Sequence, residues 1–343
     1  MPWDRVRGHE DVKARFLSAH ERGRLGQAYL FAGPDGIGKR LVALELAKSL
    51  LCERSPAPLT PCGKCPGCVQ VEAGTHPDLF RLTTPEGKHE LPVEQMREFC
   101  ARMSLKASRG TRKVGIVEDA DDFNEESANS FLKTLEEPPA GAMLILLASS
   151  TDRQLPTILS RCQVVRFSPL SPDDLRAVLV ANGIIDPTQR ERLVRLGQGS
   201  AGAALALADA DIDSVRNSLL EGLTSPRPNF ANLAELWSKF VEEAGKDTAA
   251  QRQRASLLLR FLIEALDSAL RLSLGAGVKG LDAKETDRLA AFAERVGTEA
   301  ILDLIDRCLE ADLHVERRAQ IILVIESVIA PFIRASHPAA TPR

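Results

Sequence analysis

The chain reads Gly33-Pro34-Asp35-Gly36-Ile37-Gly38-Lys39-Arg40 directly after an apolar run, residues 28–32, and directly before a helical pattern, residues 41–51. A G-x-x-x-x-G-K string that follows a strand and opens a helix is typical of a phosphate-binding loop. The glycines let backbone N–H groups and the helix N-terminus face a phosphate, and the lysine reaches the β and γ oxygens. This context predicts a nucleotide site at residues 33–40, with a plain strand-to-helix turn as the alternative.

Two departures from this motif bear on hydrolysis. P-loop enzymes place Ser or Thr after the lysine to hold Mg²⁺, whereas this chain has Arg40, a cation that cannot ligate another cation. The apolar run 114–117 ends in Glu118 and Asp119. The usual order at such a strand end is an Asp that binds Mg²⁺ followed by a Glu that activates water. We therefore expect that ATP or ADP can be bound but is hydrolysed negligibly.

Four of the seven cysteines lie within a segment of 17 residues, and they are Cys52, Cys62, Cys65 and Cys68. Four thiolates suit tetrahedral Zn²⁺, and a site filled by four protein ligands is structural rather than catalytic. An iron–sulfur cluster and free thiols are the alternatives. The spacing predicts a small zinc module, residues 52–68, on the surface, inserted after the first helix of the nucleotide-binding region.

Length and composition describe a globular chain of two or three domains. It has 343 residues, of which 44% are hydrophobic and 27% charged, and these values exclude a disordered, collagen-like or disulfide-dense chain. The apolar runs are far shorter than the roughly 20 residues that cross a bilayer. The N-terminus is charged and has no apolar core of a signal peptide. We expect a cytoplasmic protein without membrane contact.

The charge distribution limits nucleic-acid binding. The formal net charge is −3, and residues 209–335 carry 16 Lys and Arg against 21 Asp and Glu. Any DNA contact is therefore local and belongs to the first part of the chain. A basic run offers one candidate, and it consists of Lys106, Arg109, Arg112 and Lys113. Contact with a phosphate backbone is possible there, but a solvated loop is the favoured interpretation.

Apolar runs at residues 28–32, 79–82, 114–117, 143–148 and 164–167 alternate with helical patterns. This pattern predicts a parallel sheet covered by helices, and Asn124 is a candidate cap for the helix that ends before Pro138. After residue 168 only helical patterns follow, including 252–274, 283–296, 299–311 and 316–333. We expect an α/β domain over residues 1–168, a helical lid over 169–208, an all-α domain over 209–335 and a disordered tail, 336–343.

Several strings together resemble the clamp-loader branch of the AAA+ ATPases. They are NSFLKTLEEPP at residues 129–139, LPTILSRC at residues 155–162, and the four-cysteine insertion after the P-loop helix. Motor subunits of this branch carry Thr or Ser after the P-loop lysine and an Arg in a Gly-Ser-x-Arg string that opens the lid helix, called sensor 2. This chain has Arg40 and Gly202 at those two positions.

The resemblance implies a set of site residues. It assigns zinc to the four clustered cysteines and phosphate binding to residues 33–39. It makes Arg161 an arginine finger that acts on the ATP of a neighbouring subunit, with a surface arginine paired to a carboxylate as the alternative. Ser149 or Ser150 takes the sensor-1 position. The all-α region becomes a collar that holds the subunits of a ring together, although its apolar faces fit an ordinary core as well.

We therefore expect a non-hydrolysing clamp-loader subunit that works as a rigid scaffold, or stator, within a DNA polymerase holoenzyme. Its expected partners are motor and delta-type subunits in a hetero-pentameric ring, and through that complex the sliding clamp and primed DNA. One rival is an active motor ATPase, favoured by Lys39 and the acidic strand end. The other is a P-loop phosphotransferase with a zinc lid, which Ser160-Arg161-Cys162 and the long helical region oppose.

Overall fold

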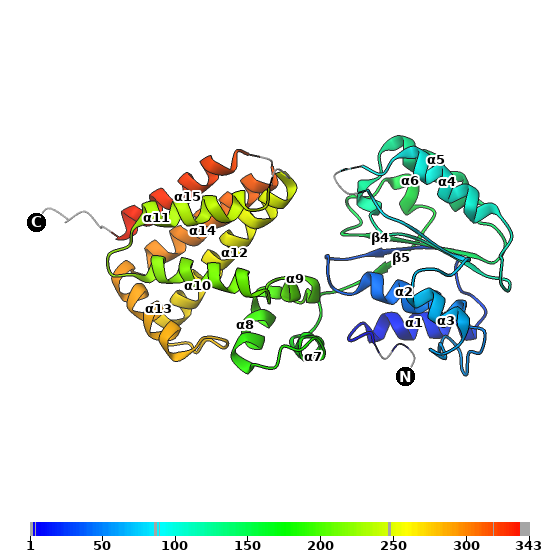
Figure 1. Ribbon diagram of the computed structural model, residues 1–343, viewed down its shortest axis with the longest axis horizontal. Coiled ribbons are helices and arrows are strands. Elements are labelled where there is room, and N and C mark those ends of the chain that lie inside the picture. The colour runs from blue at the N-terminus through cyan, green and yellow to red at the C-terminus, as the bar shows by residue number, and fades with distance from the viewer. Residues whose placement is uncertain are drawn as a thin grey trace, which may run out of the picture. The chain divides into compact units, whose positions relative to one another are not determined.

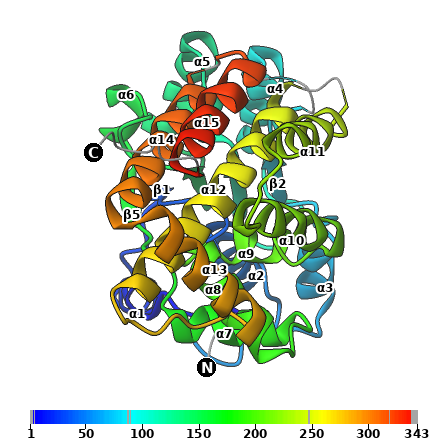
Figure 2. The same ribbon diagram turned by 90° about the vertical axis from the view of Figure 1, so that its left-hand side faces the viewer.

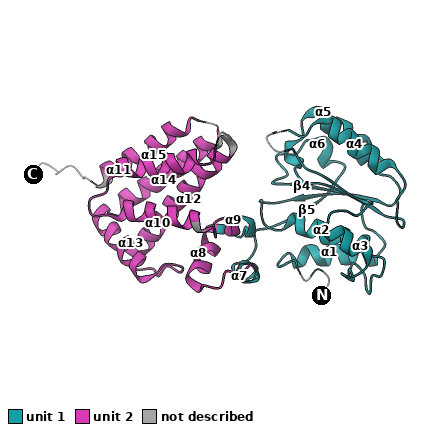
Figure 3. Cartoon of the chain, in the orientation of Figure 1, with its two compact units in different colours: residues 1–181, 197–203 teal, residues 182–196, 204–343 magenta. Residues whose placement is uncertain are grey.

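The computed structural model describes Trp3, residues 5–85, Lys88, and residues 90–245, 248–317 and 319–336. The chain forms two compact units (Figures 1 and 3). The first comprises Met1–Ala181 and Gly197–Ala203, and the second Asn182–Leu196 and Ala204–Arg343. Segment 169–208 is shared between them, and the expected division into three domains stays a prediction. The expected tail lies outside the described residues from position 337 onward.

The first unit contains a parallel five-stranded sheet in the order β2-β3-β4-β1-β5. Its strands are β1 (Ala28–Ala32), β2 (Leu79–Leu82), β3 (Lys113–Val117), β4 (Ala142–Ala148) and β5 (Gln163–Arg166). Every residue of β1, β3 and β4 is buried, as expected for strands covered on both faces. The predicted α/β fold with a parallel sheet is confirmed.

Two hydrophobic cores lie on opposite faces of this sheet. One contains Phe31 of β1 together with Val42 and Leu46 of α2. The other contains Leu30 of β1 together with Phe131 of α5. Adjacent residues of one strand thus enter different cores, because successive side chains point to opposite faces. Figure 1 shows α1, α2 and α3 on one side of the sheet and α4, α5 and α6 on the other.

The helices of the first unit are α1 (Glu10–Glu21), α2 (Lys39–Leu50), α3 (Pro66–Glu72), α4 (Val93–Ser104), the short 3₁₀ helix η1 (Ala120–Asp122), α5 (Glu125–Glu136), α6 (Pro156–Leu159) and α7 (Pro172–Ala181). The predicted cap of α5 is confirmed, because the Asn124 side chain accepts a hydrogen bond from the N–H of Ser127 at 2.9 Å. In return the Ser127 hydroxyl accepts one from the N–H of Asn124 at 3.1 Å. This reciprocal pair fixes where α5 begins.

The described residues of the second unit form helices joined by turns and loops, with no strand among them. Its helices are α8 (Pro187–Gly197), the second half of α9 (Ala201–Ala206), α10 (Ala210–Thr224), α11 (Phe230–Glu242), α12 (Thr248–Ser273), α13 (Ala283–Val296), α14 (Thr298–Glu316) and α15 (Ile321–Ser336). The prediction of one helix over 316–333 is wrong at its start, because α14 continues to Glu316. Helix α12 packs against α10, α11, α13 and α14 (Figure 2). No described helix is long and apolar enough to span a bilayer.

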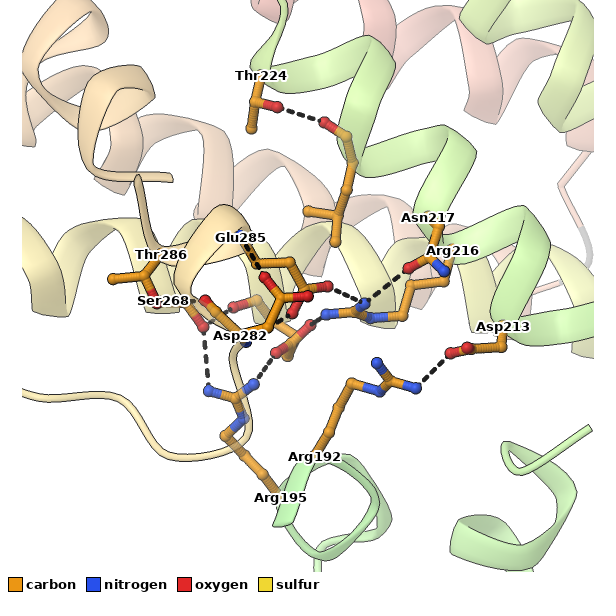
Figure 4. Close-up of polar contacts among 12 residues, drawn as sticks. Arg192, Arg195, Asp213, Arg216, Asn217, Thr224, Ser268, Asp282, Glu285 and Thr286 are labelled. Atoms are coloured by element: carbon orange, nitrogen blue, oxygen red, sulfur yellow. Dashed lines mark hydrogen bonds and ion pairs between the residues drawn. The ribbon is translucent and has the colours of Figure 1, made fainter. Parts of the chain in front are cut away.

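A buried network of charges connects four helices of the second unit (Figure 4). Arg216 of α10 is 2% exposed and contacts Glu285 of α13 at 2.7 Å and Glu264 of α12 at 3.5 Å. Glu264 also pairs with Arg195 of α8. Desolvation acts to lower the pKa of Arg216, but the facing carboxylates outweigh it and raise that pKa. Glu264 is therefore the shared counter-ion of two arginines from different helices.

We expect Glu264→Gln to destabilise the second unit by about 3–5 kcal/mol, because it leaves two largely buried cations with one carboxylate fewer. Glu221→Gln is the matched control. It removes the exposed pair with Arg288 between α10 and α13, and such pairs are worth about 1 kcal/mol or less. Hydrogen exchange of α8 and α12 measures the effect locally. Equal exchange in the two variants would contradict a stabilising role for the network.

Candidate functional site

The phosphate loop adopts the wrapped backbone that its glycines predict, and its lysine is already engaged. Lys39 begins α2 and is 7% exposed. Its ammonium donates to the carbonyl of Pro34 at 2.9 Å, to the carbonyl of Gly33 and to a carboxylate oxygen of Asp35 at 3.1 Å. The three donors of the lysine therefore satisfy acceptors of the loop itself.

The segment that opens α9 lies directly on this loop, within the first unit. The N–H of Gly202 donates to the carbonyl of Gly36 at 2.9 Å, and the Ser200 hydroxyl donates to the carbonyl of Asp35 at 2.8 Å. A Cβ at Gly202 would lie 2.8 Å from the Cα of Gly36. Position 202, where motors carry the sensor-2 arginine, therefore admits no side chain without a backbone shift.

Arg40 faces the acidic strand end. Its Nε lies 3.1 Å from one carboxylate oxygen of Glu118, and Nε of Arg81 lies 2.5 Å from the other. The Glu118 side chain is 8% exposed. The neighbouring Asp119 accepts a hydrogen bond from the N–H of Thr84 at 2.8 Å. Two guanidinium groups thus surround the carboxylate that would face a metal or a water molecule in an active site.

Further contacts near the loop had no signal in the sequence. The carboxylate of Asp121 accepts from the N–H of Ser149 at 2.6 Å and from the Gln154 amide at 2.8 Å, so it fixes the backbone at the sensor-1 position. The ring Nε2 of His9 lies 2.8 Å from the carbonyl of Ile37. These contacts join residues 28 to 33 positions apart in the chain, and spacing rules do not reach so far.

The four clustered cysteines converge as predicted. Their sulfurs all lie within 4.8 Å of one another, with 3.9 Å between Cys52 and Cys65 and 4.0 Å between Cys62 and Cys68. Four sulfurs about 2.3 Å from one zinc ion would lie roughly 3.8 Å apart. The donor set and its spacing therefore fit a tetrahedral metal ion.

Backbone N–H groups of the same segment point at these sulfurs. The N–H of Cys62 donates to Cys52 Sγ, that of Cys65 to Cys62 Sγ and that of Cys68 to Cys65 Sγ, at 3.3–3.4 Å. Hydrogen bonds from the backbone N–H groups of Lys64 and Cys65 lower the pKa of Cys62 to about 6. Such donors stabilise thiolates, the form that binds metals.

Arg161 follows α6, and its guanidinium forms hydrogen bonds with residues of the same chain. Its Nε donates to Oε1 of Glu136 at 2.9 Å, and its Nη2 contacts the same oxygen. Its Nη1 donates to the carbonyl of Thr157 at 2.9 Å and to the hydroxyl of Ser160 at 3.1 Å. The side chain remains 31% exposed. Neighbouring Cys162 is partly buried, and this burial raises the pKa of its thiol to about 12.

One member of the basic run is not solvated, which corrects the loop interpretation for that residue. Lys113 is 3% exposed, and its ammonium donates to the carbonyls of Arg102 and Leu105, both at 2.7 Å. It also lies 5.0 Å from the ring centre of Phe80. Burial lowers its pKa. Lys113 therefore satisfies carbonyls at the end of α4 and presents no charge to DNA.

The other members of the basic run are exposed, and they are Lys106, Arg109 and Arg112. Arg109 connects this loop to the zinc module, because its Nη1 lies 3.1 Å from the amide oxygen of Gln70 and 3.5 Å from a carboxylate oxygen of Glu53. The wholly buried carboxylate of Asp78 accepts the backbone N–H of Arg109 at 2.7 Å. The loop is thus tied down at two points.

Known proteins resemble this chain over roughly half to two thirds of its length. The family model described as DNA polymerase III, delta subunit, matches residues 8–171. A DNA polymerase III subunit delta' from Pseudomonas aeruginosa is 37% identical over 222 residues, which are 63% of this chain and 67% of that protein. The subunit delta' of Escherichia coli is 35% identical over 217 residues, 63% of this chain and 64% of that protein. The matches thus span about two thirds of the relatives' length.

Among solved structures, a DNA polymerase III gamma subunit-related protein from Thermotoga maritima is 19% identical. Its match covers 96% of this chain and 100% of that one, with a TM-score of 0.46.

A parallel sheet with a phosphate loop, an inserted four-cysteine cluster and an all-helical second unit define a AAA+ protein of the clamp-loader type. The chain belongs to the family of DNA polymerase III delta' subunits. Within the clamp-loader branch, Arg40 and Gly202 predict this subunit rather than a motor, and the matches confirm that prediction. The same matches support the predicted role of a clamp-loader subunit in DNA replication.

Proposed function

We propose that this chain is a non-hydrolysing scaffold subunit of the clamp loader. The observation that carries the proposal is the pairing of Arg40 with Glu118. The guanidinium stands where an active P-loop enzyme places a Mg²⁺-binding hydroxyl, and its charge disfavours a divalent cation nearby. Glu118 is the first acid of the strand end, the position that binds Mg²⁺ in active enzymes, and a buried carboxylate held by two arginines is a poor ligand for a further cation.

Groups of the chain itself occupy the binding positions of the phosphate loop. A phosphate that approached it would compete with the loop's own acceptors for the Lys39 ammonium. It would also meet the segment around Gly202, which is hydrogen-bonded to the loop. Binding of ATP or ADP requires these contacts to be exchanged, so we expect weak binding at most.

Exposed leucines of the second unit support assembly with other subunits. Leu302, Leu309 and Leu313 of α14 are about half exposed, and their spacing of seven and four residues places them on one helix face. Ile322 and Leu323 of α15 are 60% and 57% exposed. Clustered exposed apolar side chains are typical of protein–protein contacts. We propose that these exposed side chains of α14 and α15 contact neighbouring subunits in a hetero-pentameric ring. The assembled ring, rather than this chain alone, would bind the sliding clamp and primed DNA.

The zinc module completes the proposal. Cys52, Cys62, Cys65 and Cys68 would hold one Zn²⁺ as a closed structural site. A bound zinc ion supplies folding energy to the segment that surrounds it and takes part in no reaction.

The proposal predicts negligible ATP turnover by the purified chain. A phosphate-release assay should give a rate far below the roughly 10 s⁻¹ typical of enzymes. Arg40→Thr restores a hydroxyl but should stay inactive, because Gly202 provides no cation for the γ-phosphate. DNA-stimulated turnover of the unmodified chain would instead identify an active motor and refute the scaffold function.

A further inference from the structure

The guanidinium of Arg161 contacts the carboxylate of Glu136 along one edge. Oε1 of Glu136 accepts from Nε at 2.9 Å and is also contacted by Nη2. This side-on arrangement uses one hydrogen of Nη2 and leaves its second hydrogen, together with Nη1, on the edge away from the carboxylate. At that end Nη1 contacts neutral acceptors, the carbonyl of Thr157 and the hydroxyl of Ser160. The carboxylate thus fixes the plane of the guanidinium.

Glu136 lies at the end of a packed helix. It is the last residue of α5, next to Leu135, which is buried in a sheet core together with Phe131 of the same helix. Helix α5 packs against α6, whose Ile158 is also buried in that core. The carboxylate therefore stands on a packed element, whereas Arg161 lies in the short connection between α6 and β5.

Stability alone does not explain this pair. The two side chains are 31% and 49% exposed, and exposed ion pairs contribute about 1 kcal/mol or less to stability. A planar guanidinium held along one edge is well suited to direct its other edge at a phosphate, because Arg recognises phosphates with two parallel donors. A freely rotating arginine would first have to lose its rotamer entropy.

We propose that Glu136 is the positioning residue of the Arg161 finger, which it aims at the nucleotide of the neighbouring subunit. The inference rests on the proposed function, in which Arg161 acts in trans. When a γ-phosphate arrives, Nη1 exchanges its neutral acceptors for phosphate oxygens, and Nε stays on Glu136. Glu137, the next residue, is exposed, and within the described residues its side chain makes no hydrogen bond or ion pair, so it serves as a matched control.

The test uses the assembled clamp loader, with clamp and primed DNA, in single-turnover ATP hydrolysis. A slowed site then appears as a separate slow phase and is not masked by the other motor sites. Glu136→Ala should slow one site about 10- to 100-fold, the range expected for an error near 1 Å in placing a catalytic group, with an unchanged KM for ATP. Glu136→Gln keeps an acceptor for Nε and should restore most of the rate. Glu137→Ala should match the unmodified complex.

A second readout needs no partner. In the isolated chain, the Nε–H of Arg161 should exchange slowly with solvent in NMR spectra of the unmodified protein and of Glu136→Gln, and rapidly in Glu136→Ala. If Arg161→Ala slows one site while Glu136→Ala leaves all rates unchanged, the positioning role of Glu136 is wrong, and the role of Arg161 as an arginine finger is retained. If Glu136→Ala accelerates hydrolysis, the carboxylate restrains the finger, and the inference is overturned. If Arg161→Ala has no effect on the rate of ATP hydrolysis at any site, Arg161 does not act in trans, and the positioning role of Glu136 is wrong as well.

Discussion

Cys65→Ser is expected to release zinc and to unfold the segment around residues 52–72, while the sheet remains folded. The substitution is selective because Cys65 has two roles. Its sulfur is one of the four converging ligands, and it also caps α3 by accepting the N–H of Cys68. Serine is a good helix cap but a poor zinc ligand. The variant therefore removes a ligand and preserves the cap.

The expected loss is large, since structural zinc supplies roughly 10–16 kcal/mol of apparent binding energy in zinc-finger peptides. The damage should reach one face of the sheet to a small extent, because Leu59 of the module and Val71 at the end of α3 belong to the core on that face. Exposing a side chain of this size costs about 1.5–3 kcal/mol.

Elemental analysis and hydrogen exchange provide the measurement. The unmodified chain should contain one zinc per molecule, and Cys65→Ser should contain little and exchange rapidly in the module. Cys100→Ser, outside the cluster, is the control and should retain its zinc. Iron in place of zinc, or no metal at all, would show that the cluster is not a zinc site.

Arg161→Ala is expected to leave folding and complex assembly intact and to slow ATP hydrolysis at one partner site. Arginine fingers contribute roughly 10³–10⁵ in rate, because a permanent cation meets the charge that develops on the transferred phosphoryl group. The Glu136 pair that the substitution removes is exposed and contributes little to stability.

Bulk clamp loading will show a smaller loss, because the other sites continue to turn over. Circular dichroism and complex yield should match the unmodified protein. Clamp loading at the unmodified rate by the Arg161→Ala complex would mean that Arg161 is only a surface residue paired with Glu136.

Patterns of neighbouring residues in the sequence were sufficient to predict most of the fold and part of the candidate site. The strand over residues 28–32, the phosphate loop, the cap at Asn124 and the convergence of the cysteines all depend on neighbours within a few residues or on one short loop. The covalent chain restricts such groups to a few geometries, so residue type and spacing nearly determine the result. Arg40 and Gly202 likewise revealed in the sequence alone what the site lacks.

Only the tertiary structure showed which contacts replace the missing Mg²⁺-binding hydroxyl and the missing sensor-2 arginine. Arg81 of β2 reaches Glu118 because β2 and β3 are neighbours in the sheet, and Arg40 of α2 reaches the same carboxylate. Strand order and the packing of a helix on a sheet are not encoded in local spacing. Gly202 contacts Gly36 across 166 positions of the chain. Lys113 reads as a charged loop residue but is buried, because its long side chain reaches the carbonyls that end α4. The energies of such contacts arise only after distant segments have packed, so the sequence shows which groups are present and the fold decides which of them meet.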